Sequence, residues 1–224
     1  MKNKTLAISF LLSILVFILV TFIFTVDNGF TYDQVIVDKL SSINSGTFNS
    51  LMETISLFGS SEVILLITVA LGLILLIRKK WFQLILFFVL SVGGVALNFA
   101  LKMAFQRERP DGEATMIEVF NYTLEIPSYS FPSGHTMRAT ILLLFILYLV
   151  MEYLLKSIFR RIVSVLIILA ILSVAVSRLA LEAHFLSDTL AAISISISWF
   201  ALLTLIFHKF TSKKQSSYHR TIGM

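Results

Sequence analysis

The chain has 224 residues, of which 57% are hydrophobic and only 14% are charged, and its mean hydropathy is +0.91. A soluble domain carries about a quarter charged residues, so the composition excludes an ordinary soluble protein and indicates an integral membrane protein. The absence of cysteine excludes a disulfide framework, a thiol nucleophile and a cysteine-based metal site. The net charge of +5 does not indicate nucleic-acid binding, because the basic residues cluster beside hydrophobic segments.

Six stretches are apolar enough to cross a bilayer, which requires about 20 residues. They are residues 5–26, 57–77, 81–101, 137–155, 159–176 and 185–207. Lys2 and Lys4 precede the first stretch as in a signal peptide, but its apolar run is too long and no small-residue cleavage site follows. The sequence therefore predicts an all-α fold in which residues 1–207 form one bundle of six transmembrane helices, beginning with a retained signal anchor.

The distribution of Lys and Arg predicts the orientation of the chain. Most of these residues lie before the first span, in the connections at 78–80 and 156–161, and in the tail at 208–224. By the positive-inside rule these segments are cytoplasmic, so both termini are inside. The loops 102–136 and 177–184 each follow an odd-numbered span and share the outer face. We expect the basic tail to be disordered and to rest on anionic lipid.

The first outer segment, residues 27–56, is acidic. Apolar residues repeat within it at helical spacing, at Phe48, Leu51, Met52 and Ile55. This pattern favours a short amphipathic helix that lies on the membrane surface.

Three polar stretches fall at the predicted outer ends of the spans. They read Lys102-Met-Ala-Phe-Gln-Arg-Glu-Arg109-Pro110, Pro132-Ser133-Gly134-His135 and Ser177-Arg178-Leu-Ala-Leu-Glu-Ala-His184-Phe-Leu-Ser-Asp188. A charge at the edge of a membrane is costly without a partner or a function, so each stretch is a candidate site. Because both loops lie on one face, we expect the three stretches to converge.

Their residue types suit phosphoryl chemistry. Three cations, Lys102, Arg109 and Arg178, could neutralise phosphoryl oxygens. Ser133 and Gly134 come just before a predicted helix, whose first N–H groups and dipole favour an anion.

The two histidines add acid–base and nucleophilic chemistry. His184 and Asp188 are four residues apart, so a helix through them puts both on one face, where the carboxylate can fix the tautomer of the imidazole. With His135 nearby, one histidine could act as nucleophile and the other as proton donor.

Each residue also has a structural explanation. Lys102 could snorkel at a helix end, Pro132-Ser133-Gly134 could cap a helix, and His184 with Asp188 could close a short loop. Among the other charged residues, Arg138 and Glu152 in the fourth span are assigned structural roles, and Arg107, Glu108 and Glu182 structural or gating roles. Each structural explanation is plausible for one residue alone, but together they would require all three stretches to fall on one membrane face by chance.

The three stretches resemble the signatures of the type-2 phosphatidic acid phosphatase superfamily, the membrane lipid phosphate phosphatases. The family patterns are Lys-(six residues)-Arg-Pro, Pro-Ser-Gly-His and Ser-Arg-(five residues)-His-(three residues)-Asp, and every spacing is intact here. Many members repeat Arg-Pro in the first signature, where this chain has Arg107-Glu108 before Arg109-Pro110. The family's six-span layout also covers nearly the whole chain.

The resemblance implies hydrolysis of a lipid phosphate or pyrophosphate without a metal or other cofactor. It makes His184 the nucleophile, which becomes a phosphohistidine, with Asp188 orienting its ring. His135 would protonate the leaving alkoxide and then activate water. The phosphate-binding residues implied are Lys102, Arg109, Ser133, Gly134 and Arg178.

Single-chain bacterial members of this size act on phosphatidylglycerophosphate and undecaprenyl pyrophosphate. We expect one of these lipids, or phosphatidic acid, to enter from the bilayer, and the Lys- and Ile-rich composition is compatible with a bacterial source. Two alternatives stay open: a sugar-phosphate phosphatase of the same superfamily, and a lipid or anion transporter without hydrolysis. A vanadium-dependent haloperoxidase shares the signatures but is normally soluble, so six spans argue against it. The sequence does not decide the oligomeric state.

Overall fold

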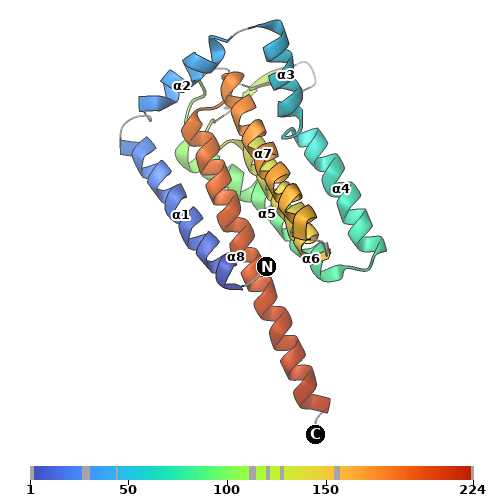
Figure 1. Cartoon of the computed structure of the whole chain (residues 1–224). Coiled ribbons are helices and arrows are strands. Elements are labelled where there is room, and N and C mark those ends of the chain that lie inside the picture. Colours follow the sequence, from blue (N-terminus) through green and yellow to red (C-terminus); the bar gives the residue numbers. More distant parts are fainter. Residues whose placement is uncertain are drawn as a thin grey trace.

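The computed structural model describes residues 3–26, 31–43, 45–110, 115–119, 122–126, 129–153 and 157–222. Six helical segments in it are long and apolar enough to cross a membrane. They are α1 (Asn3–Val26), α3 (Gly46–Leu57) with α4 (Ser61–Ile77), α5 (Trp81–Phe105), α6 (Gly134–Tyr153), α7 (Ser157–Ala180) and α8 (Leu186–Ile222). They run side by side in one bundle (Figure 1), which confirms the predicted six-span fold.

Helix α8 is the centre of the bundle, where it contacts α1, α5, α6 and α7. Small residues allow these close approaches. The hydroxyls of Ser13 on α1 and Ser198 on α8 lie 2.8 Å apart. On α5, Gly93 faces Trp199, and a Cβ added there would come within 2.5 Å of the indole ring. The indole Nε1 of Trp199 in turn donates to the Leu90 carbonyl (3.2 Å), which ties α8 to α5.

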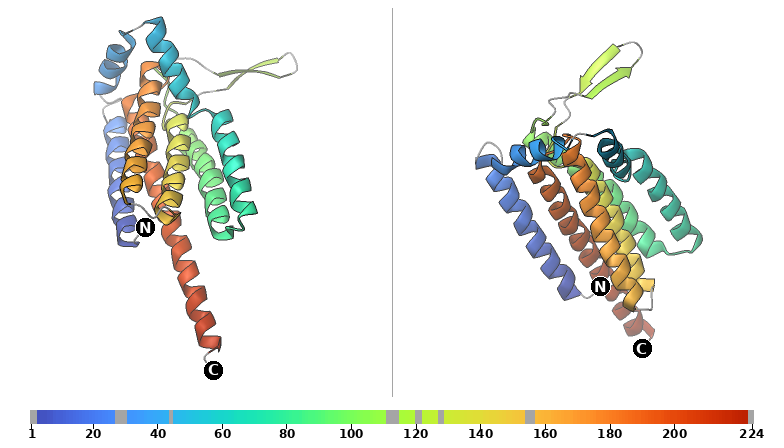
Figure 2. Two further views of the ribbon diagram at one scale, coloured as in Figure 1. Left: turned by 45° about the vertical axis from the view of Figure 1, so that its right-hand side comes forward. Right: turned by 45° about the horizontal axis from the view of Figure 1, so that its top comes forward.

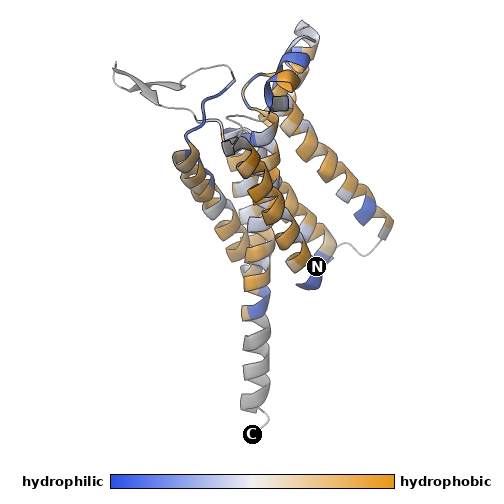
Figure 3. Ribbon diagram, turned by 90° about the vertical axis from the view of Figure 1, so that its left-hand side faces the viewer, coloured by the Kyte–Doolittle hydropathy of each residue, from blue (hydrophilic) through white to orange (hydrophobic). Residues whose placement is uncertain are grey.

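The outside of the bundle is apolar, as a membrane requires. Leu66 on α4 is 71% exposed and Phe88 on α5 is 63% exposed, and apolar residues run along the helices in Figure 3. Inside, the rings of Phe87 and Phe145 stack 4.4 Å apart. The bundle therefore has a packed interior and a surface suited to lipid contact.

The two ends of the bundle differ. The start of α1 and the end of α8 lie at one end; at the other, the helix α2 (Thr31–Ser41) lies across the bundle and α3 leads into α4 (Figures 1 and 2). Two serines start the helices that lead into the membrane here: Ser45 accepts the Phe48 N–H before α3, and Ser60 accepts the Val63 N–H before α4, each at 3.2 Å. Helix α2 contacts α7 and α8, and α3 contacts α7.

Two features differ from the sequence-based expectation. The loop 102–136 contains an antiparallel pair of strands, β1 (Thr115–Val119) and β2 (Tyr122–Ile126), in which Thr115 lies opposite Ile126 (Figure 2). The tail was expected to be disordered, but α8 continues as a helix to Ile222. The tail follows the last span without a Gly or Pro before residue 222, so no helix-breaking residue interrupts the helix. Parts of the segments 27–56 and 102–136 lie outside the described residues.

Candidate active site

The three polar stretches meet at the end of the bundle that α2 crosses (Figure 1). The first follows α5, the second begins α6, and the third joins the end of α7 to the start of α8. Backbone hydrogen bonds link them: the Ser133 N–H donates to the Asp188 carbonyl (3.2 Å), and the Ser130 N–H donates to the Arg107 carbonyl (2.7 Å). The fold thus brings together residues that are far apart along the chain: Arg107 and Asp188, whose side chains are hydrogen-bonded, are separated by 81 positions.

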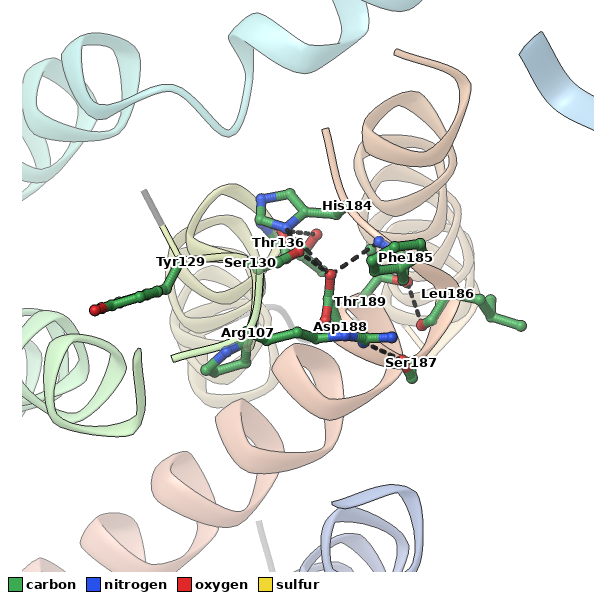
Figure 4. Close-up of polar contacts among 12 residues, drawn as sticks. Arg107, Tyr129, Ser130, Thr136, His184, Phe185, Leu186, Ser187, Asp188 and Thr189 are labelled. Atoms are coloured by element: carbon green, nitrogen blue, oxygen red, sulfur yellow. Dashed lines mark hydrogen bonds and ion pairs between the residues drawn. The ribbon is translucent and has the colours of Figure 1, made fainter. Parts of the chain in front are cut away.

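The buried pair of His184 and Asp188 occupies the middle of this site. The His184 Nδ1 atom lies 3.5 Å from Asp188 Oδ2 and 3.2 Å from Ser130 Oγ, and the Ser130 hydroxyl donates to the same carboxylate oxygen (Figure 4). The His184 side chain is only 1% exposed. Because Nδ1 faces the carboxylate and the serine, a proton there satisfies both, and Nε2 keeps the lone pair that can attack a substrate.

The surroundings keep this imidazole neutral. Burial lowers the pKa of His184 to about 4, although the hydrogen bond and charge of Asp188 act to raise it. The positive charges of Arg109 and Lys102 lower this pKa further, which places both cations within electrostatic reach of the ring. At neutral pH the ring therefore carries the lone pair that nucleophilic attack needs, and it gains a proton only as the pH falls through about 4.

Asp188 is held from several directions. Its Oδ2 atom accepts the Phe185 N–H (2.8 Å), which closes the first turn of α8, and its Oδ1 atom accepts from Arg107 Nη1 (2.7 Å). The Asp188 side chain is fully buried and the Arg107 side chain is 8% exposed. A buried carboxylate with this many donors is fixed in place and remains charged.

The start of α6 places His135 at the site. The Ser133 hydroxyl lies 3.1 Å from the Thr136 hydroxyl and accepts the Thr136 N–H at 3.5 Å, as a helix cap does. Asn98 Nδ2 donates to the Pro132 carbonyl (3.1 Å). Residue 134 is closely packed against Asn98, because a Cβ added at Gly134 would come within 3.3 Å of Asn98 Oδ1. His135 is the second residue of the helix and is partly buried.

The cations are anchored through their own contacts. Lys102 Nζ donates to the Tyr129 carbonyl, and Arg178 Nη1 donates to Ser56 Oγ on α3 (2.6 Å). The Arg178 carbonyl accepts the N–H groups of Ala183 (3.1 Å) and His184 (3.2 Å). Glu182 adopts a left-handed conformation (φ 54°) there, so it ends α7 and turns the chain towards His184.

Sequence reasoning missed three residues of this site. Ser130 contacts both His184 and Asp188, Arg107 joins Asp188 to α2, and Asp33 on α2 completes that link. Arg107 had been assigned a structural or gating role, and its position inside the first signature was the only local signal. Of the other residues so assigned, Arg138 Nη2 donates to the Gly59 carbonyl (3.3 Å) and Glu182 is exposed.

Comparison with known proteins places this geometry in a family. The family model of the PAP2 superfamily matches residues 82–212 of the sequence, which include all three polar stretches. The chain belongs to the PAP2 superfamily. The resemblance drawn from the three signatures is therefore confirmed.

Individual relatives support the same assignment. Phosphatidylglycerophosphatase B of Bacillus subtilis strain 168 is 29% identical over 173 residues, which cover 76% of this chain and 81% of that protein. The crystal structure of a transmembrane PAP2-type phosphatidylglycerolphosphate phosphatase from Bacillus subtilis matches with a TM-score of 0.70 and 27% identity, over 93% of this chain and 96% of that one. Aquifex aeolicus LpxE shares the fold, with a TM-score of 0.57 and 18% identity over 78% and 96% of the two chains.

These findings make the chain a multi-pass membrane enzyme, a lipid phosphate phosphatase of the PAP2 superfamily with bacterial relatives. They favour this function over a transporter without hydrolysis and over a sugar-phosphate phosphatase.

Proposed function

We propose that the enzyme hydrolyses its lipid phosphate through a phosphohistidine on His184. The observation that carries this proposal is the buried His184–Asp188 pair, in which the carboxylate and Ser130 occupy Nδ1. This arrangement fixes the ring and leaves Nε2 as the attacking atom.

The reaction has two steps. In the first, His184 Nε2 forms a bond to phosphorus while the bond from phosphorus to the lipid oxygen breaks, and His135 gives its proton to that oxygen. In the second, His135 takes a proton from water, the water oxygen attacks phosphorus, and the bond from phosphorus to nitrogen breaks to release inorganic phosphate. His135 is thus returned to its protonated form and His184 to its neutral form.

The phosphoryl group would be held by the cations of the site. Lys102 and Arg109 act electrostatically on His184, and the Arg178 main chain is hydrogen-bonded to the His184 N–H. Positive charge at this point offsets the negative charge that spreads over the phosphoryl oxygens in the transition state. The N–H groups at the start of α6, near Ser133 and Gly134, would add hydrogen bonds.

We further propose that the substrate is phosphatidylglycerophosphate, with phosphatidic acid and undecaprenyl pyrophosphate as candidates to compare with it. The Bacillus subtilis protein and the Bacillus subtilis crystal structure described above both carry the name of this lipid. The site lies at the end of an apolar bundle, so a head group could reach the cations while the tails remain in the membrane (Figure 3). The Lys and Arg distribution favours cytoplasmic termini and therefore an active site on the outer face.

The proposal can be tested by phosphate release from the purified protein in detergent with a metal chelator present. The three lipids would be compared with a soluble sugar phosphate. We expect chelator-resistant release from a lipid that disappears in His184→Ala and persists in His208→Ala, a matched histidine at the opposite end of the bundle. Release that survives in His184→Ala would overturn the role of His184. Faster release from the sugar phosphate would overturn the lipid assignment.

A further inference from the structure

One carboxylate of α2 is buried against the active site. Asp33 is 2% exposed, whereas Asp38, on the same helix, is exposed. Asp38 accepts a hydrogen bond from Gln34 (2.8 Å) within α2, so it serves its own helix. The described partners of the two Asp33 oxygens lie instead on other elements of the fold.

The first set of partners is the start of α8. Asp33 Oδ1 accepts the Ser187 N–H (2.8 Å), and Asp33 Oδ2 accepts the Ser187 hydroxyl (2.5 Å). The N–H groups in the first turn of a helix have no partner within the helix, so a carboxylate placed there fixes the turn. Ser187 directly precedes Asp188, and the turn that Asp33 holds is therefore the one that carries the carboxylate facing His184.

The second partner is Arg107, which joins the two carboxylates. Its Nη2 atom donates to Asp33 Oδ2 (2.8 Å), its Nη1 atom donates to Asp188 Oδ1 (2.7 Å), and its guanidinium lies 4.2 Å from the centre of the Phe185 ring. The Arg107 carbonyl also accepts the Ser130 N–H, which places the serine that contacts His184. Asp33 shares the positive charge of Arg107 with Asp188, so this cation does not act on Asp188 alone.

We propose that Asp33 is a positioning residue for phosphoryl transfer, which acts through Arg107 and the first turn of α8 to hold Asp188 against His184. The helix α2, which contributes none of the family signatures, is then part of the catalytic apparatus. This inference rests on the proposed role of His184 as the nucleophile.

The test is a double-mutant cycle on purified, monodisperse protein in detergent. Asp33→Asn, Arg107→Gln and the double variant would be compared with Asp38→Asn as the matched control. We expect Asp33→Asn to lower kcat by about 10- to 100-fold, the range for one lost hydrogen bond to a charged group, while KM changes by less than about threefold. In the Arg107→Gln background the same substitution should lower kcat much less, because the hydrogen bonds from the Arg107 guanidinium to Asp33 and Asp188 are already lost.

A second readout does not depend on turnover. In protein labelled with ¹⁵N-histidine, and assigned with His184→Ala, the ring nitrogens of His184 should show one tautomer, protonated at Nδ1, in the wild type and in Asp38→Asn. We expect a mixture of tautomers in Asp33→Asn. An unchanged His184 spectrum together with unchanged kcat in Asp33→Asn would overturn the inference. So would a loss of kcat in the double variant equal to the product of the losses in the two single variants. A wild type without phosphate release would contradict the proposed function instead, and the spectrum would still test Asp33.

Discussion

The two ends of the bundle both carry charge, but they hold it in opposite ways. At the end crossed by α2, Asp33, Arg107 and Asp188 are buried and joined to one another. At the other end, which we call the basic end, Lys80 and Arg161 are exposed. The Lys80 Nζ atom lies 4.9 Å from the centre of the Tyr153 ring.

The difference separates charges that are buried with partners from charges that remain hydrated at the surface. An exposed charge at a helix end keeps its hydration and costs little, so its position can vary. A buried charge loses its hydration and persists only where partners compensate for the loss. Asp188, one member of the buried set, faces His184, so we attribute the cost of burying these charges to the proposed catalytic role.

The largest effect is expected at the centre of the buried set. Asp188→Asn keeps the shape of the side chain but removes its charge, so the preferred tautomer of His184 and the stabilisation of its phosphorylated form are lost. We expect kcat to fall by about 10²- to 10⁴-fold. Phosphate release under saturating lipid measures this change.

The matched control for Asp188→Asn is Arg161→Gln at the basic end, which should keep kcat within about twofold. A large loss in Arg161→Gln, or a nearly active Asp188→Asn, would contradict the distinction between the two ends.

A smaller effect is expected where α6 and α7 meet the α3–α4 corner. At Gly59 an added Cβ would lie 2.9 Å from Val174 Cγ1 and 3.0 Å from the His135 carbonyl oxygen, so Gly59→Ala requires a shift in the contacts between residue 59, Val174 and the backbone of His135. We expect stability to fall by about 1–3 kcal/mol and kcat by several-fold. Thermal unfolding and phosphate release measure the two effects.

Gly46→Ala is the control for Gly59→Ala, since no atom lies within 4 Å of a Cβ added at that position. It should leave kcat unchanged. Equal behaviour of the two alanine variants would show that close packing at Gly59 does not help to place His135.

The sequence alone was sufficient to predict the six spans and the side of the bundle on which the signature residues lie. Runs of apolar residues give the six spans because the bilayer fixes their length. Counting spans then puts the loops 102–136 and 177–184 on one side, and in the structure the signatures of both loops meet. The residues of the signatures could be chosen because their spacing is intact.

The residues that hold the site in place could not be predicted from the sequence in this way. Asp33 and Ser187 are 154 residues apart, and the acidic segment around Asp33 looks like any surface helix. Only the packing of α2 across the bundle shows which acid is buried. Ser130 lies two residues before Pro132, where a small polar residue also suits an ordinary loop. The two strands at 115–126 escaped notice because short strands give weak periodicity.

The most direct test of the account is to find where phosphate becomes attached to the enzyme. Wild type, His184→Ala and His208→Ala would be mixed with ³²P-labelled lipid phosphate, quenched within milliseconds, and tested for label that is stable to alkali and lost in acid. We predict a phosphohistidine on His184 in the wild type and in His208→Ala, and none in His184→Ala. Label that remains in His184→Ala, or that maps to another residue, would contradict the assignment of His184 as nucleophile.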